Sequence, residues 1–136
     1  MTNTKRLTIY SDGAAIPNPG PSGIGVVLYD EKGGVVAEIS KYIGKSTNNK
    51  AEFTALIAGL EEALRLEAIA VDLKIDSELL VRQLQGTYRS KKMKQHYEQI
   101  RRLLGEFESY TVEHIPREKN KQADALSKKA IRRAGA

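Results

Sequence analysis

Four acidic residues lie where the sequence predicts that strands end or helices begin. Asp12 ends one apolar strand and Asp76 ends another. Glu52 and Asp124 lie in the first turns of two predicted helices. Because an α/β fold places its ligands at the carboxyl edge of the sheet, we expect the four side chains to meet there. Such carboxylates repel one another unless hard cations such as Mg²⁺ or Mn²⁺ neutralise them. Two such ions about 4 Å apart can stabilise both the attacking and the leaving oxygen in phosphodiester cleavage.

Each acid also has an ordinary structural explanation. Asp12 is a common turn residue, and Asp124 suits the positive end of a helix dipole. Asn49-x-x-Glu52 matches a capping box, in which Glu52 would bond back to the Asn49 amide. Asp76 could cap the helix that follows it. Since four separate explanations would be needed, a shared metal site is the favoured interpretation.

The hydrophobic pattern predicts one mixed α/β domain over residues 1–136. Strands are predicted over residues 6–12, 23–30, 34–44, 71–76 and 110–116, and helices over about 49–67, 77–85, 93–107 and 120–133. Three antiparallel strands followed by α-β-α-α-β-α imply a five-stranded mixed sheet with helices on both faces. The Gly-, Pro- and Asn-containing segment after Asp12 is expected to be a loop, in which Gly13 leaves the backbone beside the carboxylate accessible.

Composition limits the classes of protein. The chain has 136 residues and a formal net charge of +5 at pH 7. It has no cysteine, which excludes disulfides, thiolate zinc sites and cysteine nucleophiles. No apolar run is long enough to span a membrane, so we expect a soluble, cytoplasmic protein without a membrane partner. Two basic segments, 88–102 and 112 onward, flank an acid-rich middle, a distribution typical of a phosphate-binding surface around a site.

Four motifs together resemble type 1 ribonuclease H. They are YSDGA with NPGPSG, STNNKAEFTAL, KIDSELLVRQL and HIPREKNKQADALS, in the family's order and spacing over nearly the whole chain. The resemblance implies the ribonuclease H-like fold and hydrolysis of the RNA strand of an RNA–DNA hybrid with two Mg²⁺ or Mn²⁺ ions. It assigns the metal ligands to Asp12, Glu52, Asp76 and Asp124. We expect products with 5′-phosphate and 3′-hydroxyl ends.

The resemblance also implies substrate-binding positions. Asn48 and Asn49 match paired asparagines that contact the hybrid in its minor groove, where short polar groups can bind a 2′-OH. Gly13 matches a backbone contact to the RNA, and Asn18 and Thr47 match positions near a DNA phosphate. Helix capping is the alternative role for the paired asparagines, and turn formation is the alternative for Asn18.

The sequence departs from many family members in two places. It has no tryptophan, and only residues 87–94 replace the Trp- and Lys-rich basic protrusion, as in the short archaeal-like form. The basic residues expected to substitute in part for that protrusion are Arg89, Lys91, Lys92 and Lys94. Arg117 stands closest to the family's mobile-loop histidine and is expected to be the auxiliary catalytic residue. His114 is the alternative, although it is expected to belong to a strand.

Other functions remain open at this point. A catalytically weak module that binds hybrids or structured RNA would share the fold, and a hydrolysis assay would distinguish it. A proofreading exonuclease would usually carry Asp-x-Glu on the first strand, whereas this chain has Asp12-Gly13-Ala14. The expected partner is an RNA–DNA hybrid, with double-stranded RNA left open, and we expect a monomer.

Overall fold

One five-stranded mixed sheet forms the centre of the structure, a computed structural model that describes residues 5–86 and 92–135. The strands are β1 (Arg6–Ala15), β2 (Gly20–Tyr29), β3 (Val35–Ser46), β4 (Ala70–Ile75) and β5 (Ser109–His114). The helices are α1 (Asn48–Arg65), α2 (Glu78–Leu84), α3 (Lys94–Leu104) and α4 (Lys121–Arg133), with a short 3-10 turn, η1 (Arg117–Lys119), before α4.

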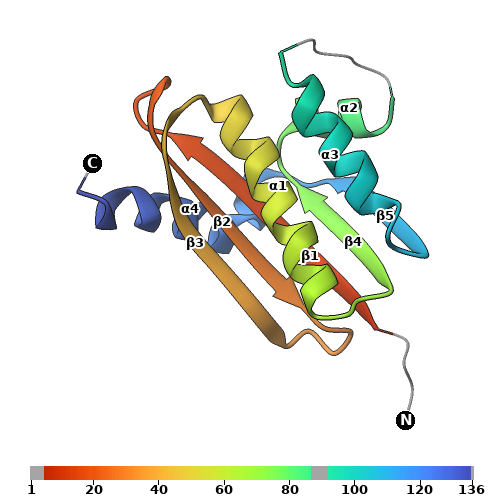
Figure 1. The fold of residues 1–136 in the computed structure, drawn as a ribbon. Coiled ribbons are helices and arrows are strands. Elements are labelled where there is room, and N and C mark those ends of the chain that lie inside the picture. The colour runs from red at the N-terminus through yellow and green to blue at the C-terminus, as the bar shows by residue number, and fades with distance from the viewer. Residues whose placement is uncertain (1–4, 87–91, 136) are drawn as a thin grey trace.

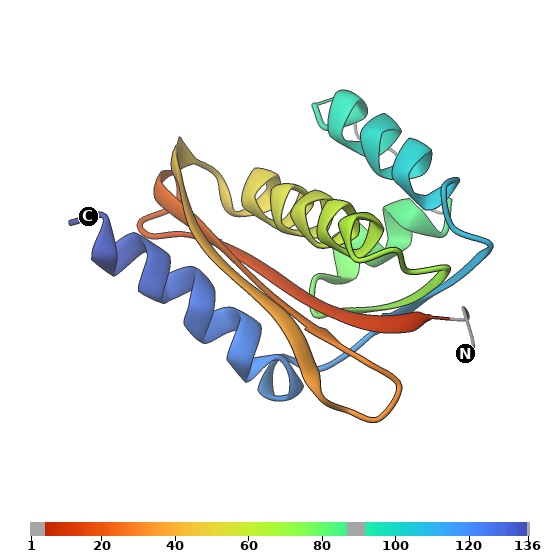
Figure 2. The same cartoon turned by 60° about the horizontal axis from the view of Figure 1, so that its bottom comes forward.

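The strand order β3-β2-β1-β4-β5 confirms the predicted topology (Figure 1). β1 pairs antiparallel with β2, and β2 pairs antiparallel with β3. β4 lies parallel to both β1 and β5, which requires a crossover connection on each side of β4. The helices α1, α2 and α3 cover one face of the sheet and α4 covers the other (Figure 2).

The apolar stripe of α1 explains how this helix is fixed on the sheet. Phe53, Leu56 and Leu60 are completely buried, and they pack in one core with residues of the strands, such as Ile9 and Leu73. Burying each of these large side chains stabilises the fold by about 1.5–3 kcal/mol. The helix therefore cannot slide along β1, and the first turn of α1 is held at one edge of the sheet.

The segment after Asp12 differs from the prediction. β1 continues to Ala15 and β2 begins at Gly20, so the loop begins three residues later and ends three residues earlier than expected. The Ile16 amide donates to the Pro21 carbonyl at 2.9 Å and closes this turn. Asp12 therefore does not end β1, because it pairs with Gly25 inside the antiparallel ladder.

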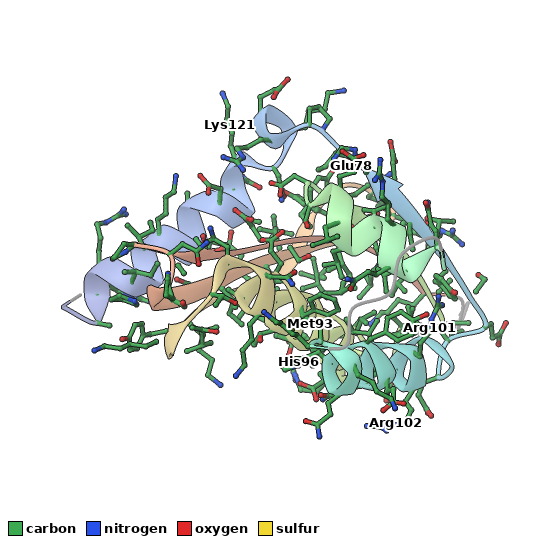
Figure 3. All side chains as sticks on the ribbon, turned by 90° about the horizontal axis from the view of Figure 1, so that it is seen from above. Glu78, Met93, His96, Arg101, Arg102 and Lys121 are labelled. Carbon is green, nitrogen blue, oxygen red and sulfur yellow. The ribbon has the colours of Figure 1, made fainter. Side chains whose placement is uncertain are left out.

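Arg101 has a structural role that the charge pattern alone does not predict. Its guanidinium donates to the Tyr97 hydroxyl at 2.9 Å, to the Tyr110 hydroxyl at 3.0 Å and to the Leu84 carbonyl. Figure 3 shows Arg101 on the side of α3 that faces the rest of the molecule and Arg102 on its outer side. Arg101 thus ties α3 to the end of α2 and to β5.

Candidate metal-binding active site

Three carboxylates meet at one edge of the sheet. Asp12, Glu52 and Asp76 each offer an oxygen atom, and these oxygens all lie within 4.8 Å of one another. Asp12 is 8% exposed and Glu52 is 9% exposed, so both carboxyl groups are almost completely withdrawn from solvent. The cluster confirms the expectation that these three acids converge, although they are far apart in the sequence.

Strand register brings Asp12 and Asp76 together. The parallel pairing of β1 with β4 ends at Ser11 and Ile75, which lie opposite each other. Asp12 directly follows Ser11 and Asp76 directly follows Ile75, so the two acids lie just beyond the same residue pair of the two strands. Their carboxylates therefore belong to the carboxyl edge of two neighbouring parallel strands, where α/β folds place ligands.

Glu52 reaches this edge through a contact with the backbone of β1. Its Oε1 accepts a hydrogen bond from the Gly13 amide at 2.5 Å. The N-cap of α1 is Thr47, whose Oγ1 accepts from the Lys50 amide at 3.1 Å. The capping box between Asn49 and Glu52 therefore does not form, since Thr47 caps the helix and Glu52 points to the site.

Gly13 permits this close approach of β1 and α1. A Cβ atom at this position would lie 2.2 Å from the carbonyl carbon of Ala51, which is a severe clash with helix backbone. Gly13 is almost completely buried against α1, although it also borders the cleft beside the carboxylates. The glycine is needed for packing, and this packing lets Glu52 reach the Gly13 amide.

Burial and mutual repulsion determine the protonation of the cluster. Loss of solvent, together with the hydrogen bond and charge of Glu52, raises the pKa of Asp12 to about 10. Burial also raises the pKa of Glu52 to about 7, although the bonds from Asp12 and Gly13 oppose this rise. The three acids cannot all be ionised at neutral pH without a compensating cation. This all-oxygen donor set fits a hard divalent ion such as Mg²⁺ or Mn²⁺.

Asp124 lies beside the three clustered acids. It comes from the first turn of α4, borders the same cleft and is close enough to Asp12 to contribute to its raised pKa. Its Oδ2 lies 3.0 Å from Lys128 Nζ, an i,i+4 ion pair on α4. The structure thus groups three of the four predicted ligands and places the fourth next to them with a lysine as its counterion.

The cleft around the carboxylates has a volume of about 460 Å³. Arg117 from η1 lies on its border, and the positive charge of Arg117 helps to limit the rise in the pKa of Glu52. His114 belongs to β5, as expected, and is the last residue of this strand; its Nε2 lies 3.3 Å from the backbone oxygen of Asp76. Of the two auxiliary candidates, Arg117 is therefore the one that borders the cleft.

Some of the predicted substrate-binding residues lie at or near the cleft, and others lie near the start of α3. Asn48 and Asn49 border the cleft. The Oδ1 of Asn18 accepts from the Asn48 amide at 3.1 Å, and the Oδ1 of Asn48 accepts from the Ala15 amide at 2.7 Å. These bonds join the β1–β2 turn to the start of α1.

The predicted basic substitutes for the protrusion lie elsewhere. Lys92 and Lys94 are exposed near the start of α3, and neither borders the cleft. Arg89 and Lys91 lie outside the described residues. The predicted contacts of Lys92 and Lys94 with the hybrid would therefore be made away from the carboxylates.

Two residues that contact the carboxylates were not predicted from the sequence. Lys128 had a signal, since it lies four residues after Asp124 on the same helix. Asn120 is 1% exposed, and its Nδ2 donates to Asp76. Its position before α4 suggested only an ordinary helix start.

The fold and the carboxylate cluster together define a ribonuclease H-like domain. Residues 10–130 match the family model described as "Reverse transcriptase-like", and the chain belongs to this family. No helix in the described part of the chain is long and apolar enough to cross a membrane.

Similar proteins agree with this assignment. The chain is 40% identical to the ribonuclease HI of Halobacterium salinarum, over 93% of this chain and 64% of that protein. It is 36% identical to the bifunctional protein Rv2228c of Mycobacterium tuberculosis, over 93% of this chain and 35% of that protein. The chain therefore spans less than two thirds of the length of either relative.

Two solved structures are similar over nearly their whole chains. The crystal structure of RNase H1 from Halobacterium salinarum matches with a TM-score of 0.90 at 40% identity. The match covers 93% of this chain and 97% of the chain in that structure. LC11-RNase H1, in complex with an RNA/DNA hybrid, has a TM-score of 0.88 at 43% identity and covers 96% of this chain and 99% of its own. The resemblance to type 1 ribonuclease H and the predicted fold are thus confirmed.

Proposed function

We propose that this chain is a ribonuclease H, a metal-dependent endonuclease that hydrolyses the RNA strand of RNA–DNA hybrids. The observation that carries the proposal is the cluster of Asp12, Glu52 and Asp76, with their oxygens within 4.8 Å. The family of the chain and its similarity to a ribonuclease HI and to a structure bound to an RNA/DNA hybrid support the substrate.

The metal ions would be held by Asp12, Glu52 and Asp76, with Asp124 as a fourth ligand. Held by these carboxylates, two Mg²⁺ or Mn²⁺ ions would supply Lewis-acid stabilisation of the phosphoryl charge and lower the pKa of water for attack. Glu52 is oriented by the Gly13 amide, so its carboxylate is preorganised. Asp124 would exchange its contact with Lys128 for the metal.

The chain's other residues would bind and orient the hybrid. Asn48 and Asn49 border the cleft, and we propose that they and the Gly13 backbone contact the minor groove, where the 2′-OH marks the RNA strand. Asn18 and Thr47 would lie near a phosphate of the DNA strand.

Cationic side chains would act on the phosphates. Arg117, at the border of the cleft, would stabilise negative charge that develops on the cleaved phosphate. The exposed Lys92 and Lys94, with Lys91, would contact the backbone of the duplex and add affinity that depends on salt.

Monomeric action in the cytoplasm is part of the same proposal. Every residue assigned to the metal ions or to the hybrid belongs to one chain, so a second copy is not needed. Double-stranded RNA is a second substrate to be tested.

One gel tests the function. A hybrid, a double-stranded RNA and a duplex DNA are each incubated with Mg²⁺, Mn²⁺ or chelator, with Asp76→Asn as the inactive control. We expect cleavage of the RNA in the hybrid only with metal, and products with 5′-phosphate and 3′-hydroxyl ends. Tight binding of the hybrid without cleavage would favour a binding module, and 2′,3′-cyclic phosphate ends would exclude attack by water.

A further inference from the structure

Asn120 occupies the N-cap position of α4 without capping it. Asparagine is favoured at such positions because its side-chain oxygen accepts a hydrogen bond from an amide in the first turn. In the described chain, the side chain of Asn120 makes no such bond to α4. The side chain is instead 1% exposed and points into the interior, so its polar groups must find partners there.

Both hydrogens of the Asn120 amide group are used at the metal site. Nδ2 lies 3.0 Å from Oδ2 of Asp76 and 2.9 Å from the carbonyl oxygen of Ser11. The opposite orientation of the amide would place an oxygen against these two acceptors. The Oδ1 atom is buried with no hydrogen-bond partner among the described residues. The fold thus directs the amide donors of Asn120 to Asp76 and Ser11.

The same residue connects three elements that carry the acids. Ser11 precedes Asp12 on β1, and Asp76 follows β4. The backbone oxygen of Asn120 accepts from the Asp124 amide at 3.1 Å, within α4. Figure 3 shows Glu78 and Lys121, at the starts of α2 and α4, on the same side of the molecule. Asn120 therefore links the backbone beside Asp12, the carboxylate of Asp76 and the backbone of Asp124.

From this geometry we infer that Asn120 is a positioning residue, which holds the Asp76 carboxylate in the orientation that metal binding needs. The inference rests on the proposed function and adds a residue to its site. A carboxylate with one oxygen held by a fixed donor cannot rotate freely, so less order has to be gained when the ion binds. Partners of this kind typically change metal affinity by about 10–100-fold when they are removed.

The test compares Asn120→Ser with the parent by calorimetric titration of Mg²⁺ and Mn²⁺ without nucleic acid. Serine is an equally good N-cap residue but has no amide donor that could reach Asp76, so helix α4 should start as before. We expect metal affinity to fall by about tenfold or more. Turnover of the hybrid should fall at limiting metal and recover at high metal, with the KM for the hybrid unchanged.

Gln122→Ala is the matched control. Gln122 is exposed in the first turn of α4, and its side chain bonds the Tyr29 hydroxyl, away from the carboxylates. This variant should bind metal as the parent does. Weaker binding in Asn120→Ser alone would support the inference, whereas equal loss in both variants would overturn it and indicate a general effect of α4.

The other outcomes also decide. Parental metal affinity in a folded Asn120→Ser would overturn the role of Asn120 and leave the proposed function intact. A parent protein that binds no metal would overturn both. If circular dichroism shows Asn120→Ser unfolded, Asn120→Gly replaces it, because glycine is also tolerated at an N-cap. Failure of both variants to fold would overturn the inference in favour of a folding role.

Discussion

Asp12→Asn should make the metal-free protein more stable while abolishing activity. The Asp12 carboxyl is 8% exposed and faces Glu52 and Asp76. Its pKa rises from 3.8 to about 10, first because of burial and then because of Glu52. Between these two pH values the folded protein holds a proton that the unfolded chain releases, so the free energy of unfolding falls as the pH rises. Asparagine does not titrate, so the variant does not show this fall in the free energy of unfolding.

The magnitude follows from the same linkage. At pH 7 the distance from the ordinary pKa of 3.8 corresponds to about 4 kcal/mol, which is the upper limit for the stability that the parent loses. Burying the asparagine amide with incomplete hydrogen bonding costs about 1–3 kcal/mol. We therefore expect the free energy of unfolding of Asp12→Asn to exceed that of the parent by about 1–3 kcal/mol at pH 7 in chelator.

Urea unfolding of both proteins at pH 4 and pH 7, with chelator and with Mg²⁺, measures this effect. The relative stability of the variant should be highest at pH 7 and decline toward pH 4, where the carboxyl is protonated in the folded parent and partly protonated in the unfolded parent as well. Added Mg²⁺ should stabilise the parent more than the variant, because ligands that bind only the folded state raise its stability.

Asp72→Asn provides a control of opposite sign. Asp72 is bonded to Arg6, which lowers the pKa of this carboxyl. A lowered pKa contributes stability above the unfolded value, which is lost as the pH falls, so Asp72→Asn should destabilise the protein at pH 7. If Asp12→Asn were less stable than the parent in chelator at pH 7, the repulsion inferred within the cluster would be refuted.

Three further variants test the site and the substrate-binding surface. Arg117→Ala should lower kcat far less than Asp12→Asn, because Arg117 only assists at the border of the cleft, and equal losses in single-turnover assays would contradict this order. Changing Lys92 and Lys94 together to alanine should weaken hybrid binding and reduce the slope of log K against log salt by about 1 per lost phosphate contact, and an unchanged slope would place these contacts elsewhere. Gly13→Ala should cost about 1–3 kcal/mol or more by urea unfolding and lower activity, since its Cβ would meet the Ala51 backbone at 2.2 Å, and parental values for both would show that β1 and α1 tolerate separation.

The order of elements was predictable because its signals are local. The spacing of apolar residues that predicts α1 and the strands can be recognised within a few residues of sequence. The buried positions Phe53, Leu56 and Leu60 confirm the apolar stripe of α1. The convergence of Asp12, Glu52 and Asp76 was also predictable, since the carboxyl edge of the sheet collects strand ends and helix starts.

Features that depend on a distant partner were not predictable. β1 and β2 extend through a segment rich in Gly and Pro because each supplies the other's hydrogen bonds, and composition suggested only a loop. Arg101 was counted with a phosphate-binding surface, yet its guanidinium is half-buried and donates to Tyr97, Tyr110 and the Leu84 carbonyl. Net charge indicates a kind of partner and cannot say which cations are already paired.

Capping and metal binding compete for the same residue types, and this competition explains the remaining errors. The starts of α1 and α2 are capped by hydroxyl groups, those of Thr47 and Ser77. That division of labour leaves Glu52 and Asp76 free for the cluster, although their positions resembled caps. At α4 no hydroxyl takes over, and Asn120 gives up its cap to bind Asp76. A helix start without its side-chain capping bond is less stable, so the fold keeps it only where the site gains, as proteins often exchange stability for function.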